Sequence, residues 1–199
     1  MFPPMLEIHG KRECPFAWRA RLAAYDKGVP YSFIAFDAER PDPRSAEHNP
    51  EHRSPLLWDD GYVLPESLVI AQYIDESREG RSLMPSESRE RGRMRLLLAT
   101  LVSKLEVSPS HAKDKDAAVK KTREGHRALD EALRNGRRFL GGDVPLLPDL
   151  MLWPFLAMQQ EDGFRIPADL PRAHAYWARA RDRESLRATR ANPSASRER

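Results

Sequence analysis

Residues 6–36 of the chain, LEIHGKRECPFAWRARLAAYDKGVPYSFIAF, decide the fold of its first half. Apolar and polar residues alternate over residues 6–9, which predicts a strand. Residues 15–27 are good helix formers that begin with a proline and are followed by Gly28, so they predict a helix. Residues 31–36 are rich in aromatic residues and isoleucine and predict a second strand. A strand, a helix and a strand in this order predict a parallel pair with a right-handed crossover.

The next stretch of the chain continues as a hairpin and a helix. Residues 55–58 and 62–64 flank the turn sequence DDG, a pattern typical of a β-hairpin. Residues 67–79 carry apolar side chains at helical spacing after an initial serine, which predicts an amphipathic helix. The first half is therefore expected to be an α/β domain with the order βαβ and then ββα.

The second half of the chain has the apolar spacing of helices, and the fold class is therefore α/β plus all-α. The expected helices cover residues 87–108, 114–135, 149–161 and 170–188. The expected division is an α/β domain in residues 1–80, a linker in 81–86, an all-helical domain in 87–188 and a tail in 189–199. The tail lacks large apolar side chains, so we expect it to be disordered.

Composition and charge exclude several classes of protein. Apolar residues make up 40% and charged residues 32% of the chain, which excludes a collagen, a coiled-coil rod and a fully disordered chain. The 33 basic and 30 acidic residues are interleaved, which favours a solvated surface over a nucleic-acid interface. The longest apolar run, residues 150–158, is shorter than the roughly 18 residues of a membrane helix, and the sequence MFPPMLEIHG has no signal-peptide pattern. Because Pro50 separates His48 from His52, we expect no metal site there.

Cys14 is the first candidate for chemistry. It is the only cysteine, so the chain has no internal disulfide, and a reducing cytoplasm is its expected location. It falls at the start of the predicted helix 15–27, where unpaired N–H groups and the positive end of the helix dipole favour a thiolate. The alternative is a small buried apolar residue. Ala17 stands where a dithiol oxidoreductase has its second cysteine, so a disulfide of Cys14 would form with an external thiol.

Two further candidates lie in the hairpin and after it. Ser67 opens the helix 67–79 and offers an anion site, and Glu66 offers a carboxylate to an ammonium group. Together they match the head of an amino acid, and the alternative is a plain helix cap. Pro55 begins a strand, where proline is uncommon unless the strand is at an edge or the peptide bond is cis. A cis bond would leave the backbone of Ser54 free to pair with an extended peptide.

Three motifs in order, CPFAWRARL (14–22), SPLL (54–57) and LPES (64–67), resemble the thioredoxin-like half of the cytosolic glutathione transferases. The resemblance is closest to the omega class and to its relatives, the dehydroascorbate reductases and the chloride intracellular channel proteins. FLGGD (139–143) and PDL (148–150) resemble the helical domain of the same family. The resemblance therefore covers both halves of the chain and implies a thioredoxin-like N-terminal domain followed by an all-helical domain.

The resemblance also implies roles for individual residues. Cys14 would bond the sulfur of glutathione, which is the expected co-substrate. The implied glutathione-binding residues are Phe16, Arg40, Ser54, Pro55, Glu66 and Ser67. Of these, Ser54 would pair its backbone with the cysteinyl unit ahead of a cis Pro55, and Glu66 and Ser67 would hold the γ-glutamyl head. Arg40, with Arg44 as its rival, would bind the glycyl carboxylate.

The chain departs from the family pattern at three points. Ser54 stands where valine is common, which leaves the local packing open. Leu146 stands where a serine or threonine caps a helix of the second domain, and a cap with Asp149 alone is expected to cost about 1 kcal/mol. The chain is also shorter at its C-terminus than typical omega-class proteins, so we expect an open acceptor pocket. Arg19 and Arg21 are expected to form structural ion pairs.

The implied function is that of a glutathione-dependent thiol transferase or reductase that works through a mixed disulfide on Cys14. The acceptor would be a small-molecule or protein thiol or disulfide, and the assembly would be a homodimer. Two alternatives remain: a non-catalytic binding module that regulates a partner, and a glutathione-dependent isomerase or dehalogenase.

Overall fold

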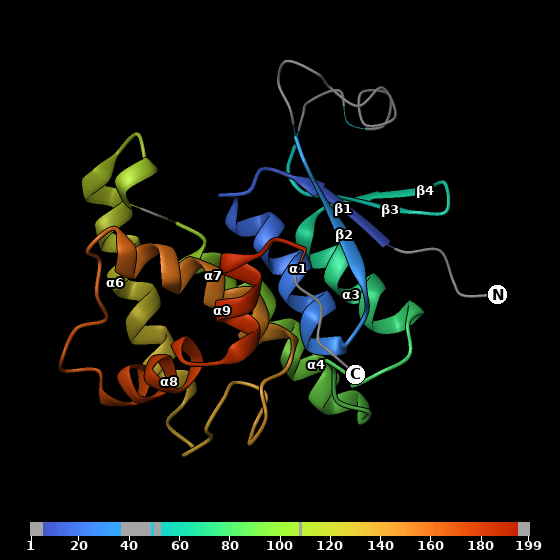
Figure 1. The fold of residues 1–199 in the computed structure, drawn as a ribbon. Helices are drawn as coiled ribbons and strands as arrows, with labels where there is room; N and C mark the ends of the chain where they lie inside the picture. Colours follow the sequence, from blue (N-terminus) through green and yellow to red (C-terminus); the bar gives the residue numbers. More distant parts are fainter. Residues whose placement is uncertain (1–5, 37–48, 50–52, 108, 195–199) are drawn as a thin grey trace. The chain divides into compact units, whose positions relative to one another are not determined.

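The structure is a computed structural model that describes residues 6–36, 49, 53–107 and 109–194 (Figure 1). Contacts between residues divide the chain into two units. The first unit runs to Ser82 and resumes at Arg187, and the second runs from Leu83 to Leu186. The return of the chain to the first unit at Arg187 was not part of the prediction, and it supplies contacts near the candidate site.

The first unit is built on a four-stranded mixed sheet with the strand order β2-β1-β3-β4. Its elements are β1 (Leu6–Gly10), α1 (Pro15–Lys27), β2 (Tyr31–Ala35), β3 (Leu56–Asp59), β4 (Tyr62–Pro65) and α3 (Ser67–Ser77). Strands β1 and β2 pair in parallel, while β3 is antiparallel to both β1 and β4. The predicted thioredoxin-like βαβ and ββα units are therefore confirmed.

The core of the first unit explains why α1 and α3 pack on the same face of the sheet (Figure 1). Both helices and the three strands β1, β2 and β3 contribute to one apolar cluster. Its buried members are Leu6, Ile8, Ala20, Ala24, Val29, Tyr31, Leu57, Ile70 and Ile74. Small alanines on α1 allow a close approach to the apolar face of α3, and this packing fixes the starts of the two helices relative to each other.

The second unit is helical. Its elements are α4 (Ser88–Leu97), the π-helical turn η1 (Leu98–Val102), α5 (Ser103–Leu105), the 3₁₀ turn η2 (Pro109–His111), α6 (Lys115–Ala132), α7 (Leu147–Glu161) and α8 (Pro171–Arg181). The continuous helix predicted for residues 87–108 is therefore interrupted. The hydroxyls of Thr100 and Ser103 donate to the carbonyls of Leu96 and Ala99, at 2.7 Å in both cases. Such bonds compete with the backbone ladder, which is consistent with the widened turn.

The helix predicted for residues 170–188 is two helices, because α8 ends at Arg181 and α9 (Glu184–Ala191) follows. The expectation of a disordered tail from residue 189 is wrong for the residues that the structure describes. Helix α9 includes Thr189, whose side chain is fully buried. Polar contacts rather than large apolar side chains hold this segment, and composition alone therefore missed it.

The cap of α7 is stronger than the sequence predicted. The Asp149 carboxylate accepts hydrogen bonds from the backbone N–H groups of Leu140 (2.8 Å), Gly141 (3.0 Å) and Leu146 (2.9 Å). It also accepts one from the Tyr176 hydroxyl at 2.9 Å. The missing hydroxyl at Leu146 is therefore offset, because Asp149 satisfies N–H groups of the preceding turn as well as that of the N-cap residue.

One further property of the helices concerns membranes. Within the ranges that the structure describes, no helix has both the length and the apolar character needed to span a lipid bilayer.

Candidate active site

Cys14 lies where the sequence predicted, at the N-terminus of α1. It occupies the N-cap position with an extended backbone (φ −73°, ψ 120°), and Pro15 follows in the first turn. The thiol is free and partly exposed. Its Sγ is 3.6 Å from the carbonyl oxygen of Ser54, to which the protonated thiol donates. The side chain does not cap its own helix, so the sulfur remains available to a reactant from outside.

Ser54 and Pro55 stand directly beside this thiol. The Ser54–Pro55 peptide bond is cis, as the resemblance implied. The Ser54 hydroxyl accepts a hydrogen bond from the backbone N–H of Lys11 at 3.0 Å. This hydrogen bond links the segment before β3 to the loop between β1 and α1.

Gly10 makes this close approach possible. A Cβ at residue 10 would lie 2.7 Å from the Ser54 hydroxyl oxygen, 3.0 Å from the Ala17 Cβ and 3.6 Å from the Pro55 Cα. The first two separations are shorter than ordinary contacts between such atoms. Only glycine lets the end of β1, the first turn of α1 and the segment before β3 meet at one point.

Glu66 and Ser67 approach from the start of α3. Glu66 has a positive φ of 72° with ψ 109°, a conformation that costs a non-glycine residue free energy. Its side chain makes no capping hydrogen bond. Instead, Glu66 Oε1 lies 3.5 Å from a guanidinium nitrogen of Arg53, and both side chains are more than half exposed. Ser67 is buried at the first position of the helix.

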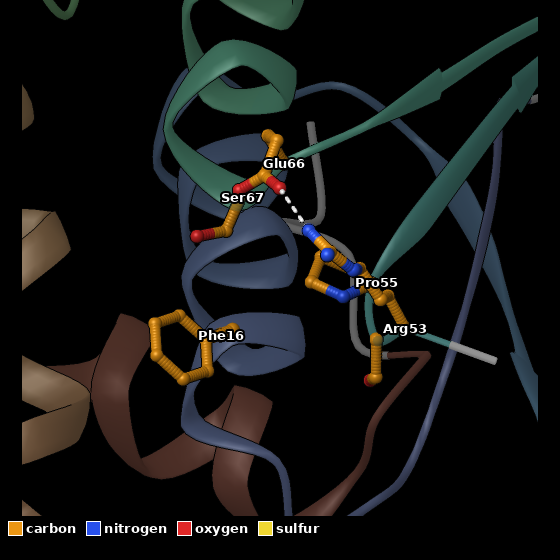
Figure 2. A pocket seen from close by; sticks show the side chains of 6 residues that line it. Phe16, Arg53, Pro55, Glu66 and Ser67 are labelled. Atoms are coloured by element: carbon orange, nitrogen blue, oxygen red, sulfur yellow. Dashed lines mark hydrogen bonds and ion pairs between the residues drawn. The ribbon is translucent and has the colours of Figure 1, made fainter. Parts of the chain in front are cut away.

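These residues surround one cavity of about 220 Å³, lined by Phe16, Arg53, Ser54, Pro55, Glu66 and Ser67. Figure 2 shows the Glu66 carboxylate turned toward Arg53, with the ion pair dashed. Five of the residues that the sequence singled out for binding are thus brought together in the structure, beside the carbonyl that contacts Cys14. Arg40 and Arg44 lie outside the described residues.

Arg53 is the lining residue that the sequence analysis did not assign to the site. The sequence could have indicated it, because this cation directly precedes the Ser54-Pro55 pair. The carbonyl of Arg53 accepts a hydrogen bond from the Asn49 side chain at 2.6 Å, and its N–H donates to the same side chain at 2.9 Å. Asn49 therefore fixes the backbone of Arg53 on the segment that enters the cavity.

The arrangement combines opposite charges with a free thiol. The backbone N–H groups at the start of α3 can bind a carboxylate, and the Glu66 carboxylate can bind an ammonium. Arg53 adds an exposed cation at the rim of the cavity, in an ion pair with the Glu66 carboxylate. The thiol of Cys14 lies beside the Ser54 carbonyl and therefore next to this cavity.

Two family models match the chain, one in each half. Residues 13–77 match the family described as Glutathione S-transferase, N-terminal domain, and residues 91–184 match Glutathione S-transferase, C-terminal domain. The rice (Oryza sativa subsp. japonica) protein "Probable glutathione S-transferase DHAR1, cytosolic" is 31% identical over 187 residues, which is 90% of this chain and 84% of the relative.

Mouse (Mus musculus) "Glutathione S-transferase omega-1" is 27% identical over 159 residues, covering 75% of this chain and 65% of the mouse protein. The chain spans less than two thirds of the length of several curated relatives that it matches. The solved structure of glutathione transferase Omega 3C from Trametes versicolor has a TM-score of 0.79 at 19% identity, covering 99% of this chain and 88% of that one. This likeness supports the fold. On these matches and on the two-part architecture, the chain belongs to the glutathione S-transferase family.

Proposed function

We propose that the protein is a glutathione-dependent thiol transferase or reductase of the omega and dehydroascorbate-reductase type, with Cys14 as its catalytic residue. The observation that carries the proposal is the placement of a free, partly exposed thiol 3.6 Å from the Ser54 carbonyl, next to the cavity of Glu66 and Ser67. A cysteine at this place forms a disulfide with glutathione, whereas a serine or tyrosine could not.

The proposed reaction has two exchanges. The Cys14 thiolate attacks the glutathione sulfur of a glutathionylated acceptor, so that the Cys14–glutathione disulfide forms and the acceptor leaves as its thiol. A second glutathione thiolate then attacks the mixed disulfide, releases oxidised glutathione and restores Cys14. In the sum, the acceptor is reduced, two glutathione units become oxidised glutathione, and the enzyme is unchanged.

The binding residues are assigned within the same proposal. Ser67 and the first N–H groups of α3 bind the γ-glutamyl carboxylate, and Glu66 binds its ammonium group. The Ser54 backbone pairs with the cysteinyl unit, and Phe16 lies beside the peptide. Arg40, with Arg44 as its rival, remains the proposed partner of the glycyl carboxylate. A cytoplasmic location and a homodimer belong to the proposal as well.

The test is mass spectrometry of the intact protein after treatment with oxidised glutathione. We expect wild type to gain one glutathione unit that a reductant removes, and Cys14→Ala to gain none. Turnover of a glutathionylated peptide should disappear in the same variant. If wild type binds glutathione but forms no adduct, the thiol-transfer mechanism is wrong. A regulatory binding module or an isomerase would then be favoured, and turnover of an isomerase substrate would separate these two.

A further inference from the structure

Arg21 is a buried cation close behind the candidate thiol, and the reaction described above does not use it. It lies on α1, seven residues after Cys14, and its side chain is 1% exposed. Burial lowers its pKa to about 10, so the guanidinium still carries its charge near neutral pH. A buried charge is costly unless the structure satisfies it. Its partners therefore show what the charge is used for.

The partners of Arg21 are backbone carbonyls rather than the carboxylate that the sequence predicted. One guanidinium nitrogen donates to the carbonyl of Arg12 at 3.1 Å, and another donates to the carbonyl of Thr189 at 3.0 Å. The guanidinium also lies over the Phe33 ring, 4.8 Å from its centroid. Within the described part of the chain, no acidic side chain lies within ion-pair distance of Arg21. Its expected ion pair is thus wrong.

Each of the two carbonyls has a distinct location. Arg12 belongs to the loop between β1 and α1 and stands two residues before Cys14. Thr189 belongs to the part of α9 that packs in the first unit. The two carbonyls are far apart in sequence, and the planar guanidinium reaches both because it presents several N–H donors at fixed angles. Arg21 therefore fastens the loop that carries Cys14 to α9.

Further contacts join α9 to the same region. The Trp18 indole N–H donates to the Thr189 hydroxyl at 2.8 Å. The guanidinium of Arg190 lies 4.9 Å from the centroid of the Trp18 ring and 3.7 Å from the carboxylate of Glu13. Glu13, the residue directly before Cys14, is therefore also linked to α9. The charged or titratable groups that act on Arg21 are Tyr31, Arg190, Cys14 and Glu13.

We infer that Arg21 is a positioning residue, which holds the Cys14 loop against α9 through the carbonyls of Arg12 and Thr189. The residues of α9 from Arg187 onward then help to position Cys14, although they do not line the cavity. Without the guanidinium, both carbonyls lose their donor, and the loop gains freedom just ahead of the thiol. The inference concerns the reactivity of Cys14 and deepens the proposed function, since a displaced thiol would exchange more slowly.

The experiment compares Arg21→Met and Arg21→Lys with Lys27→Met as a matched control. Lys27 is also a buried cation of α1, paired with Asp75 at 2.9 Å, but it lies at the opposite end of the helix. At 1.5 Å per residue, it is about 20 Å from Cys14 along the axis. Urea unfolding measures how much stability each variant loses, so that a general loss of stability can be separated from a local effect.

Two measurements decide the outcome. The first is the rate at which iodoacetamide alkylates Cys14. We expect Arg21→Met to slow it about tenfold, because a thiol on a loosened loop spends less time at the start of α1, where the helix dipole favours the thiolate. Arg21→Lys keeps the charge but cannot bridge both carbonyls, so its Cys14 should be alkylated about threefold more slowly than in the control. The alkylation rate of Lys27→Met should match that of wild type. The second is hydrogen exchange of the backbone, which should speed up in residues 11–14 and 187–191 of the Arg21 variants alone.

The inference is overturned if Cys14 of either Arg21 variant is alkylated at the same rate as in Lys27→Met. It is also overturned if residues 11–14 and 187–191 keep their protection from hydrogen exchange. Should Arg21→Met fail to fold, the comparison of Arg21→Lys with Lys27→Met decides by the same criteria. The outcome is separable from that of the proposed function. Slower alkylation in a protein whose wild type forms no glutathione adduct would support the inference and refute thiol transfer. A glutathione adduct in wild type, together with an unchanged alkylation rate in the variants, would support thiol transfer and refute the inference.

Discussion

Replacing Glu66 tests whether its backbone conformation at the start of α3 lowers the stability of the folded protein. Glu66 has φ 72° and ψ 109°, outside the regions that residues with a Cβ favour. Such a conformation costs about 1–3 kcal/mol. Glycine would remove this cost but would add about 0.5–1 kcal/mol through the greater freedom of the unfolded chain. We therefore expect Glu66→Gly to be more stable than Glu66→Ala by about 1 kcal/mol.

Comparing these two variants isolates the backbone. Both lack the carboxylate, so the ion pair with Arg53 is lost in each and does not affect the difference. That pair is more than half exposed on both sides and contributes little on its own. Urea unfolding of the two variants under identical conditions measures the difference. If Glu66→Ala is as stable as Glu66→Gly, the positive φ is not a source of strain in solution, and the reasoning fails.

A third variant, Glu66→Gln, addresses binding rather than stability. It keeps the shape and the Cβ of Glu66 but removes the charge that the proposal assigns to an ammonium. A charge-assisted hydrogen bond is worth about 1.5–3 kcal/mol, which corresponds to a loss of glutathione affinity of about 10- to 100-fold. Calorimetric titration with glutathione measures this loss. An unchanged affinity would remove Glu66 from the proposed binding site.

Two further predictions concern packing and pH. Gly10→Ala should destabilise the protein by about 1–3 kcal/mol in urea unfolding and slow alkylation of Cys14, because the new Cβ would press on the Ser54 hydroxyl at 2.7 Å; unchanged stability would contradict the close approach. Burial raises the pKa of Asp149 from 3.8 to about 6, so the folded state holds the proton more tightly than the unfolded chain. This contribution to stability is present below pH 4 and is lost as the pH rises to about 6, on the order of 3 kcal/mol. Unfolding of wild type and Asp149→Asn at several pH values should show this fall in wild type alone, and parallel curves would refute the assignment.

Local patterns predicted the regular parts of the first unit well. Helix 15–27, which ends before Gly28, and the hairpin around the DDG turn were found at or within a residue of the expected positions. Both depend on short-range physics, namely helix capping and turn geometry. The site depended on more than these patterns, because only the resemblance linked three separate motifs. The three motifs meet at one cavity because the topology of the sheet brings them together.

The parts that the sequence did not reveal depend on distant contacts. The π-helical turn at Leu98–Val102 contains no glycine or proline, the residues that signal a break most strongly. The strained backbone of Glu66 is likewise invisible in the sequence. Burial of Thr189 follows from its contacts with Trp18 and Arg21, more than 160 residues earlier in the chain. A polar segment of this kind appears solvated until its partners are known.

Arg21 and Asp149, two of the buried charged residues, both satisfy backbone groups of an irregular segment. Arg21 donates to carbonyls of the loop before α1 and of α9, and Asp149 accepts from N–H groups of the turn before α7. Irregular segments cannot satisfy their backbone groups within a helix or sheet, so a buried polar side chain with several hydrogen-bonding atoms satisfies them instead. Only the first of these loops leads to Cys14, which we propose as the catalytic residue. Removing Asp149 should therefore cost stability while leaving the thiol chemistry intact, whereas removing Arg21 should cost both, and the two substitutions together distinguish support of the fold from support of the site.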